Sequence, residues 1–317
     1  MSLPFMPPEA SSLAPRYDVL FVAMTALTTA VSLAVTIVGL WFLLRYRRRA
    51  TVDRSRPPAA AQLRRRRILE TIWIGVPLLL FIAVFAWSAS LYYDRSTPPA
   101  GALEVAVVAK QWMWKLEHAT GQREIDVLHV PVNVPVKLVM TSQDAIHSFF
   151  VPAFRVKQDV LPGRYTVLWF TATRAGDYQL YCAEYCGTDH ARMFGHVIAL
   201  APPQYQRWLD AQGATTTMAA HGEALFRALG CSGCHGANAS VHAPALEGVY
   251  GRPVPLADGT TIIADDRYLR DSILLPKRQV AAGYEPIMPS FAGQVDEAEV
   301  LDLIAYIRHL GGKEALR

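Results

Sequence analysis

Two long uncharged segments constrain this chain more than any other feature of its sequence. Val19–Leu44 holds 26 consecutive residues without a charge, and Thr71–Tyr93 holds 23. About 20 apolar residues in a helix cross the hydrocarbon core of a bilayer, and buried helices of globular proteins rarely run so far without a charge. The sequence therefore predicts a two-pass membrane hairpin, with Pro77 as a candidate kink in the second span.

The positive charge of the chain is concentrated between these segments. Residues 45–67 hold ten arginines and one aspartate, so they contribute +9 to a net charge of +4 and leave −5 elsewhere. A short Arg-rich loop is predicted to be cytoplasmic, which places the N-terminus and everything after Tyr93 outside, on the periplasmic side. No nucleic-acid patch is expected from such local basicity. Residues 1–18 lack the pattern of a cleavable signal, so both spans are expected to stay.

The external part begins with a region of β-sheet character. Segments rich in β-branched and aromatic residues predict strands, with turns at Pro162-Gly163 and Gly176-Asp177, and no long helical period intervenes. A small β-sandwich is therefore expected from about residue 101 to 200. The predicted strands are Leu103–Leu116, Val130–Met140, Tyr165–Ala172, Tyr178–Tyr181 and His196–Leu200.

The pattern then changes to helical. Tyr205–Ala211 predicts a helical turn, Gly213–Met218 has the composition of a linker, and His221–Leu229 and Asp296–Leu310 have helical periodicity. The apolar face of the last helix is predicted to consist of Val300, Leu303, Ile304 and Ile307. We therefore expect three domains, at residues 1–95, 96–212 and 213–317.

The four cysteines form two close pairs, each with a histidine nearby. Cys182 and Cys186 lie in CAEYCGTDHARM, which ends at Met193, and His147 lies upstream. Thiolates, imidazoles and a thioether favour copper, and two cysteines could bridge a metal pair. A structural Cys₂His₂ zinc site competes, although the added methionine and the sandwich context argue against it. A disulfide within so short a ring is geometrically awkward.

The second pair lies in Cys231-Ser-Gly-Cys234-His235. This C-x-x-C-H signature predicts a c-type haem, with two thioether bonds to the cysteines and the histidine as an iron ligand. A chance match and a redox C-x-x-C motif are the alternatives.

The motif from Cys182 to Met193 resembles that of a known protein family. The pattern C-x-E-x-C-G-x-x-H-x-x-M with a preceding histidine resembles the binuclear copper centre of cytochrome oxidase subunit II. The resemblance implies a cupredoxin-like sandwich in which two cysteines bridge the coppers, the histidines and methionine are terminal ligands, and one backbone carbonyl contributes. The implied ligands are His147, Cys182, Glu184 (through its carbonyl), Cys186, His190 and Met193. In that family the glutamate side chain also reaches a magnesium ion at the boundary with subunit I, which the resemblance carries to Glu184.

Two further stretches match the same family. Glu70-Thr-Ile-Trp73 resembles the opening of the second span, where the glutamate marks the mouth of a proton path; neutralising the neighbouring arginines is the alternative role. Gln111-Trp112-Met113-Trp114 resembles the aromatic stretch in which the first tryptophan faces the electron donor, so Trp112 takes that role here. A tryptophan in a strand is more often a packing residue. Family members often have an aromatic residue where this chain has Met113.

The C-terminal region resembles the all-α class I cytochromes c. In that family the sixth iron ligand is a methionine, which the resemblance carries to Met288; the rival His242 follows His235 too closely to reach the opposite face of a haem. Pro244 and Leu246 are expected to line the haem pocket. Methionine and histidine ligation raises a haem potential.

Together these features resemble subunit II of caa-type cytochrome c oxidases. The resemblance implies a chain in a bacterial-type inner membrane that passes electrons from soluble cytochrome c, or another external donor, through haem c and two coppers to haem in subunit I. Oxygen reduction and proton translocation would occur in that partner, alongside further oxidase subunits. Two alternatives remain: the electron-accepting subunit of a copper-containing nitric oxide reductase, and a membrane-anchored copper-binding assembly protein.

Overall fold

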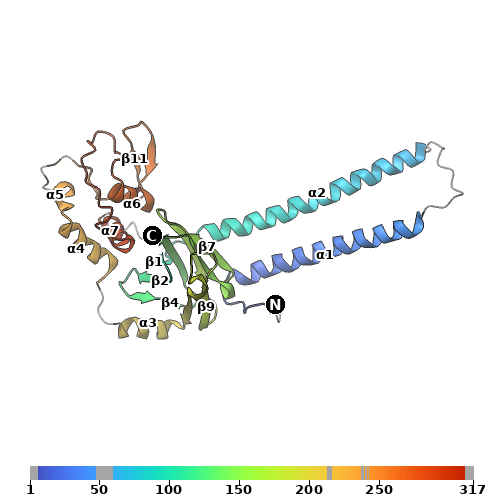
Figure 1. Ribbon diagram of the computed structural model, residues 1–317, viewed down its shortest axis with the longest axis horizontal. Helices are drawn as coiled ribbons and strands as arrows, with labels where there is room; N and C mark the ends of the chain where they lie inside the picture. Colours follow the sequence, from blue (N-terminus) through green and yellow to red (C-terminus); the bar gives the residue numbers. More distant parts are fainter. Residues whose placement is uncertain are drawn as a thin grey trace. The chain divides into compact units, whose positions relative to one another are not determined.

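The computed structural model describes residues 6–47, 60–212, 216–236, 239, 241 and 243–310. The described chain divides into two compact units (Figure 1). The first is residues 15–95, and the second combines the segment that ends at Ala14 with the chain from Ser96 onward.

The first unit is a pair of long helices, α1 (Ala14–Arg45) and α2 (Ala60–Ser96). Their most apolar 18-residue windows have mean hydropathies of 2.1 and 2.3, and none of those windows is buried. Both helices are long and apolar enough to cross a membrane, and an ion pair of 2.5 Å joins Arg16 to Asp94 at one end of the hairpin. Pro77 lies inside α2.

The second unit begins with a sandwich of two five-stranded sheets, ordered β3-β2-β1-β5-β8 and β4-β10-β9-β6-β7. The strands are β1 (Leu103–Lys110), β2 (Met113–His118), β3 (Arg123–Ile125), β4 (Val127–Pro131), β5 (Pro135–Ser142), β6 (His147–Val151), β7 (Val156–Val160), β8 (Thr166–Thr171), β9 (Gly176–Cys182) and β10 (Phe194–Leu200). Two short 3₁₀ helices, η1 (Pro152–Phe154) and η2 (His190–Arg192), interrupt them.

Two predicted strands were wrong as single elements. Leu103–Leu116 is a hairpin of β1 and β2 that reverses at Gln111 and Trp112, although neither is a typical turn residue. Val130–Met140 is divided between β4 and β5 at Asn133, whose φ of 60° lies in the left-handed region. The strands β3, β6 and β7 were not predicted at all.

After the sandwich comes α3 (Pro202–Ala211), which covers the predicted turn Tyr205–Ala211. Its Trp208 stacks on His129 of β4, with ring centroids 4.6 Å apart. Half of the predicted linker, residues 213–215, lies outside the described residues, and its last residue, Met218, begins α4.

The C-terminal region contains α4 (Met218–Ala228), α5 (Ser232–His235), α6 (Asp266–Leu274) and α7 (Glu297–His309), with a small ribbon of β11 (Pro253–Pro255) and β12 (Thr261–Ile263). The helix α4 crosses α7 closely, because a Cβ at Gly222 would lie 2.0 Å from the carbonyl oxygen of Asp302. The predicted apolar face of α7 is confirmed: all four residues are buried in one core. The helix α6 was missed, since its buried face includes Arg270 and Asp271.

The segment before α1 packs against the sandwich. The Ala10 amide donates to the carbonyl of Ala153 at 3.0 Å, and the Thr173 amide donates to the carbonyl of Ala10 at 2.9 Å. Ala10 and Leu13 are buried there. The described residues before α1 therefore belong to the same unit as the sandwich, as expected if both lie on one side of a membrane.

Candidate functional site

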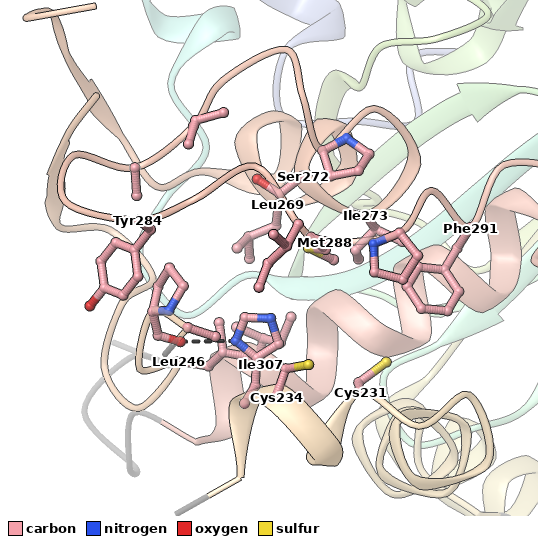
Figure 2. A pocket seen from close by; sticks show the side chains of 18 of the residues that line it. Cys231, Cys234, Leu246, Leu269, Ser272, Ile273, Tyr284, Met288, Phe291 and Ile307 are labelled. Carbon is pink, nitrogen blue, oxygen red and sulfur yellow. Dashed lines mark hydrogen bonds between the residues drawn. The ribbon is translucent and has the colours of Figure 1, made fainter. Parts of the chain in front are cut away.

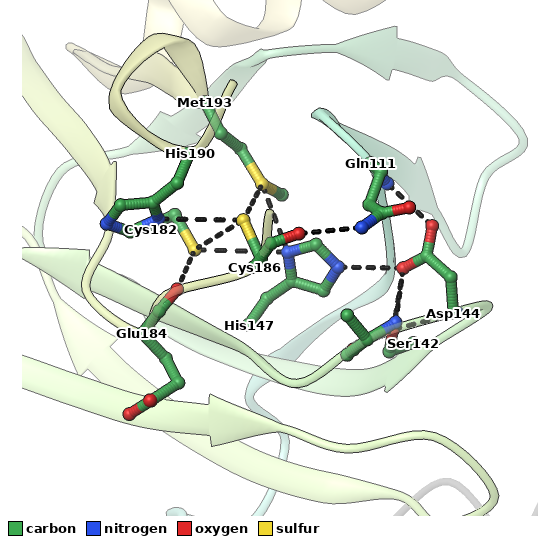
Figure 3. A network of polar contacts seen from close by, with 10 residues as sticks. Gln111, Ser142, Asp144, His147, Cys182, Glu184, Cys186, His190 and Met193 are labelled. Atoms are coloured by element: carbon green, nitrogen blue, oxygen red, sulfur yellow. Dashed lines mark hydrogen bonds and ion pairs between the residues drawn. The ribbon is translucent and has the colours of Figure 1, made fainter. Parts of the chain in front are cut away.

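Two thiols from one end of the sandwich form the centre of the first candidate site (Figure 3). Cys182 ends β9, and Cys186 follows in the loop to β10; their Sγ atoms are 3.8 Å apart and both side chains are buried. The carbonyl oxygen of Glu184 lies 3.2 Å from the Cys182 Sγ. No disulfide joins the thiols, so both are available as ligands.

Three more donors converge on the thiols from two elements. The His147 Nδ1, at the start of β6, lies 3.9 Å from the Cys182 Sγ and 3.1 Å from the Met193 Sδ. The Cys186 Sγ lies 3.5 Å from the His190 Nδ1 and 3.7 Å from the Met193 Sδ. The two histidines thus approach different thiols.

The electrostatics of the thiol pair favour a cationic occupant. Burial opposes ionisation of Cys182, but its hydrogen bonds, of which the one with His147 counts most, together outweigh burial and lower the pKa to about 6. Burial and the charge on Cys182 raise the pKa of Cys186 to about 12. The pair alone therefore holds one negative charge, and cations are needed to hold both as thiolates. The donor set fits soft metal ions such as copper.

Two residues that sequence reasoning missed orient the donors. The Asp144 Oδ1 accepts a hydrogen bond from His147 Nε2 at 2.9 Å, which leaves Nδ1 free to face the sulfurs. The Gln111 amide donates to Asp144 at 2.7 Å, and its side chain donates to the Cys186 carbonyl at 2.7 Å. The aspartate three residues before His147 was the available signal.

Trp112 lies beside this network. A Cβ at Gly187 would be 3.3 Å from the Trp112 ring, and Gly187, with φ of +124°, tolerates no ordinary side chain there. The ring therefore packs over the backbone directly after Cys186, and it is partly exposed.

Two acidic residues were also predicted as site residues, Glu184 and Glu70. The Glu184 carboxylate points away from the sulfurs, while its carbonyl faces them (Figure 3). Glu70, on α2, accepts a hydrogen bond of 2.8 Å from Arg66 one turn earlier, which is the contact expected of a neutralising residue.

The second candidate site is an apolar cavity of about 320 Å³ in the C-terminal domain (Figure 2). Cys231 and Cys234 stand on one wall as free thiols, and Met288 stands on the opposite wall. Predicted pocket residues Pro244 and Leu246 also line it. An apolar cavity with two thiols on one side suits covalent attachment of a flat macrocycle.

The histidine of this motif has a defined tautomer. His235 donates from Nδ1 to the carbonyl oxygen of Pro244 at 2.9 Å. Because a carbonyl only accepts, the Nε2 lone pair is left available for a metal. The rival ligand His242 lies outside the described residues.

Comparisons with known proteins match both halves of the external region. Residues 115–200 match the family described as cytochrome C oxidase subunit II, periplasmic domain, and residues 219–311 match the cytochrome c family.

Individual relatives match larger or overlapping parts of the chain. The cytochrome c oxidase subunit 2 of Cereibacter sphaeroides is 30% identical over 248 residues, which cover 66% of this chain and 80% of that protein. That of Alkalihalophilus pseudofirmus is 27% identical over 310 residues, or 93% of this chain and 86% of that protein. The alternative cytochrome c oxidase subunit 2 of Bradyrhizobium diazoefficiens is 30% identical over 170 residues, or 44% of this chain and 60% of that protein.

Proposed function

Because this chain belongs to the cytochrome c oxidase subunit II family and carries a cytochrome c domain, we propose that it is the electron-accepting subunit of a caa-type respiratory oxidase. The observation that carries the proposal is the convergence of four further donor atoms on two buried thiols, in the same chain as a C-x-x-C-H motif that opens into an apolar cavity. Residues 1–95 would anchor the chain in the lipid bilayer of a bacterial inner membrane, residues 96–212 would hold copper and residues 213–317 would hold haem.

Two copper ions fit the first site. The thiols of Cys182 and Cys186 would hold them together with the side chains of His147, His190 and Met193 and the Glu184 carbonyl. Such a centre supplies one-electron transfer with little movement of its ligands. The chain contributes a buried, water-poor pocket and the hydrogen bond from His147 to Asp144, which hold the ligands in place before and after transfer.

A covalent haem c fits the second site. Cys231 and Cys234 would attach the haem covalently, and His235 and Met288 would supply the nitrogen and sulfur donors for its iron. The hydrogen bond from His235 to Pro244 fixes the imidazole so that its free nitrogen faces the cavity. The apolar walls exclude water and so disfavour the additional positive charge of oxidised haem iron. This effect would raise the haem reduction potential, as methionine ligation also would.

We infer that electrons pass from an external donor, such as a soluble cytochrome c, through the haem domain to the copper site, and from there to haem in subunit I. Oxygen would be reduced to water in that subunit, coupled to proton translocation, within an assembly of further oxidase subunits. Trp112 would serve electron transfer toward copper, Glu70 would stand at the mouth of a proton path, and the exposed Glu184 carboxylate would reach magnesium at the boundary with subunit I.

The test is combined optical and electron paramagnetic resonance spectroscopy of the purified full-length chain, produced with haem attachment and supplied with copper. A covalent haem spectrum beside the signal of two coppers sharing one unpaired electron is expected. Met193→Leu should alter the copper signal and spare the haem. Haem without that copper signal would leave a membrane-tethered cytochrome and would overturn the assignment of Cys182 and Cys186. Oxygen or nitric oxide consumption by the purified complex then separates the oxidase from a nitric oxide reductase.

A further inference from the structure

The strand β1 is apolar on both faces. Val105, Val107 and Ala109 alternate with Ala106 and Val108, and all five are buried. A sandwich strand with one face in water alternates apolar and polar residues, whereas a strand covered on both faces is continuously apolar. The sequence of β1 is therefore suited to a covered outer face.

The C-terminal domain provides that cover. Ala106 and Val108 of β1 and Val139 of β5 form one buried cluster with Met218 of α4 and Leu301 of α7. The three sandwich residues are 7%, 3% and 1% exposed, so the contact excludes water. Two domains that are merely joined by a linker would leave these side chains in solvent.

Tyr165 extends the contact from the loop before β8. Its side chain packs against this cluster and also against the core of the C-terminal domain. The nearby Arg270 of α6 donates to the carbonyl of Gly163 at 3.4 Å. The loop of the copper domain is thus inserted beside α6.

Ion pairs join the domains on two flanks of the cluster. On one flank Arg308 of α7 donates to Glu104 of β1 at 2.5 Å, and Lys137 of β5 holds the same carboxylate at 2.9 Å. On the other flank Arg123 of β3 donates to Asp302 of α7 at 3.3 Å, and the Asp302 side chain is completely buried. Asp302 also contacts His221 of α4 within its own domain, so Arg123 supplies the additional cation that joins this buried carboxylate to the sandwich.

The same contact brings a wall of the haem cavity toward the copper loop. A cleft of about 440 Å³ lies between Lys110, beside Gln111 of the copper network, and Gly293 of the C-terminal domain. Gly293 lies two residues after Phe291, and Phe291 lines the haem cavity. On the other side of the cleft, Gln111 is hydrogen-bonded to the carbonyl of Cys186.

From these contacts we propose that the haem domain is docked on the outer face of β1 and β5 as a fixed module, and that Val108, Glu104 and Arg308 are positioning residues for electron transfer between the two sites. The proposal rests on the proposed function for its redox consequence. Electron transfer from haem to copper then proceeds within one rigid unit, and an external donor has to reach only the haem domain.

The decisive variant is Val108→Glu. An ionised carboxylate in the apolar cluster is expected to shift the equilibrium toward the undocked state by about a hundredfold or more, yet it is compatible with the outer face of an uncovered sheet. The matched control is Val167→Glu: Val167 of β8 is the cross-strand partner of Val139 on the same face, but it is 42% exposed.

A milder variant, Glu104→Gln, removes the interdomain ion pair and leaves Arg308 bound to Asp266. Because Glu104 is 33% exposed, Glu104→Gln should shift the equilibrium toward the undocked state by only about fivefold.

Two readouts on the full-length chain in detergent test the proposal. Hydrogen–deuterium exchange of peptides from β1 and α7 reports docking without reference to any cofactor. The rate of copper reduction after photoreduction of the haem reports electron transfer, and in the docked state it should not depend on solvent viscosity. Val108→Glu is expected to increase exchange in both peptides, slow the transfer and make it viscosity-dependent, while Val167→Glu changes neither readout.

Unchanged exchange in Val108→Glu, or rapid exchange of β1 and α7 in the unaltered chain, would overturn the docking. Increased exchange with an unchanged transfer rate would overturn the positioning role. If the chain binds neither haem nor copper, the proposed function fails while the exchange measurement still decides the docking.

Discussion

Removal of the Asp144 carboxylate tests the copper assignment through a residue that is not itself a predicted ligand. His147 is completely buried, and its Nε2 donates to Asp144 at 2.9 Å. The same carboxylate accepts backbone hydrogen bonds of 2.7 Å from Gln111 and from Ala145. In Asp144→Ala the imidazole loses its only fixed partner on that side, so its ring orientation and tautomer are no longer held.

Loss of such an orienting partner typically weakens metal binding 10- to 100-fold. This corresponds to about 1.4 to 2.7 kcal/mol of binding free energy. Asp144→Asn should cost less, because its amide oxygen still accepts a hydrogen bond while the charge is lost. Copper affinity is to be measured by competition with a chelator of known affinity, with haem content as a check on folding.

Asp177→Ala is the matched control. It breaks a histidine–aspartate contact of the same kind, between His196 and Asp177 at 2.7 Å, on strands β9 and β10 but outside the donor cluster. Copper affinity should not change in this variant. If Asp144→Ala bound copper as tightly as the unaltered chain, with full haem content, then His147 would not be a ligand held by Asp144 and the reasoning would fail.

Three further outcomes are expected. Met288→Ala should lower the haem potential in a redox titration and leave the copper signal intact, since methionine ligation raises the potential. Burial and the nearby Asp302 raise the pKa of Glu117 from 4.5 to about 7; the folded chain then binds the proton more tightly than the unfolded chain, so stability should fall as pH rises from about 4.5 to 7, and thermal melts of Glu117→Gln should lose that slope. Gly222→Ala should destabilise the haem domain by about 1 to 3 kcal/mol in thermal unfolding, because its Cβ meets the backbone of α7, whereas Gly233→Ala has open space and should not.

Features formed by residues that lie close together in the sequence could be predicted from it. The uncharged runs predicted the helical hairpin, and the apolar period of α7 predicted its buried face. Within the loop from Cys182 to Met193, the covalent chain itself keeps the donors within a few residues of one another. The structure brings these side chains together with His147, as their residue types suggested.

Other local features misled the reading of the sequence. The β1–β2 hairpin turns at Gln111 and Trp112, which carry no glycine or proline signal. The helix α6 buries Arg270 against Glu297, so its buried face lacks the continuous apolar pattern by which a helix is predicted. In both cases tertiary contacts stabilise an element for which the local sequence contains no recognisable signal.

The two apolar spans, the thiol loop and the C-x-x-C-H motif could be recognised from sequence, because each consists of residues that the covalent chain keeps close together. The partners that orient these groups, such as Asp144 behind His147, and the surface of the sandwich that the haem domain covers could be identified only in the folded chain. These contacts join residues that lie far apart in the sequence: Arg308 and Glu104 are 204 positions apart. The apolar pattern of a strand indicates that a face is covered, but it does not specify which distant segment covers it.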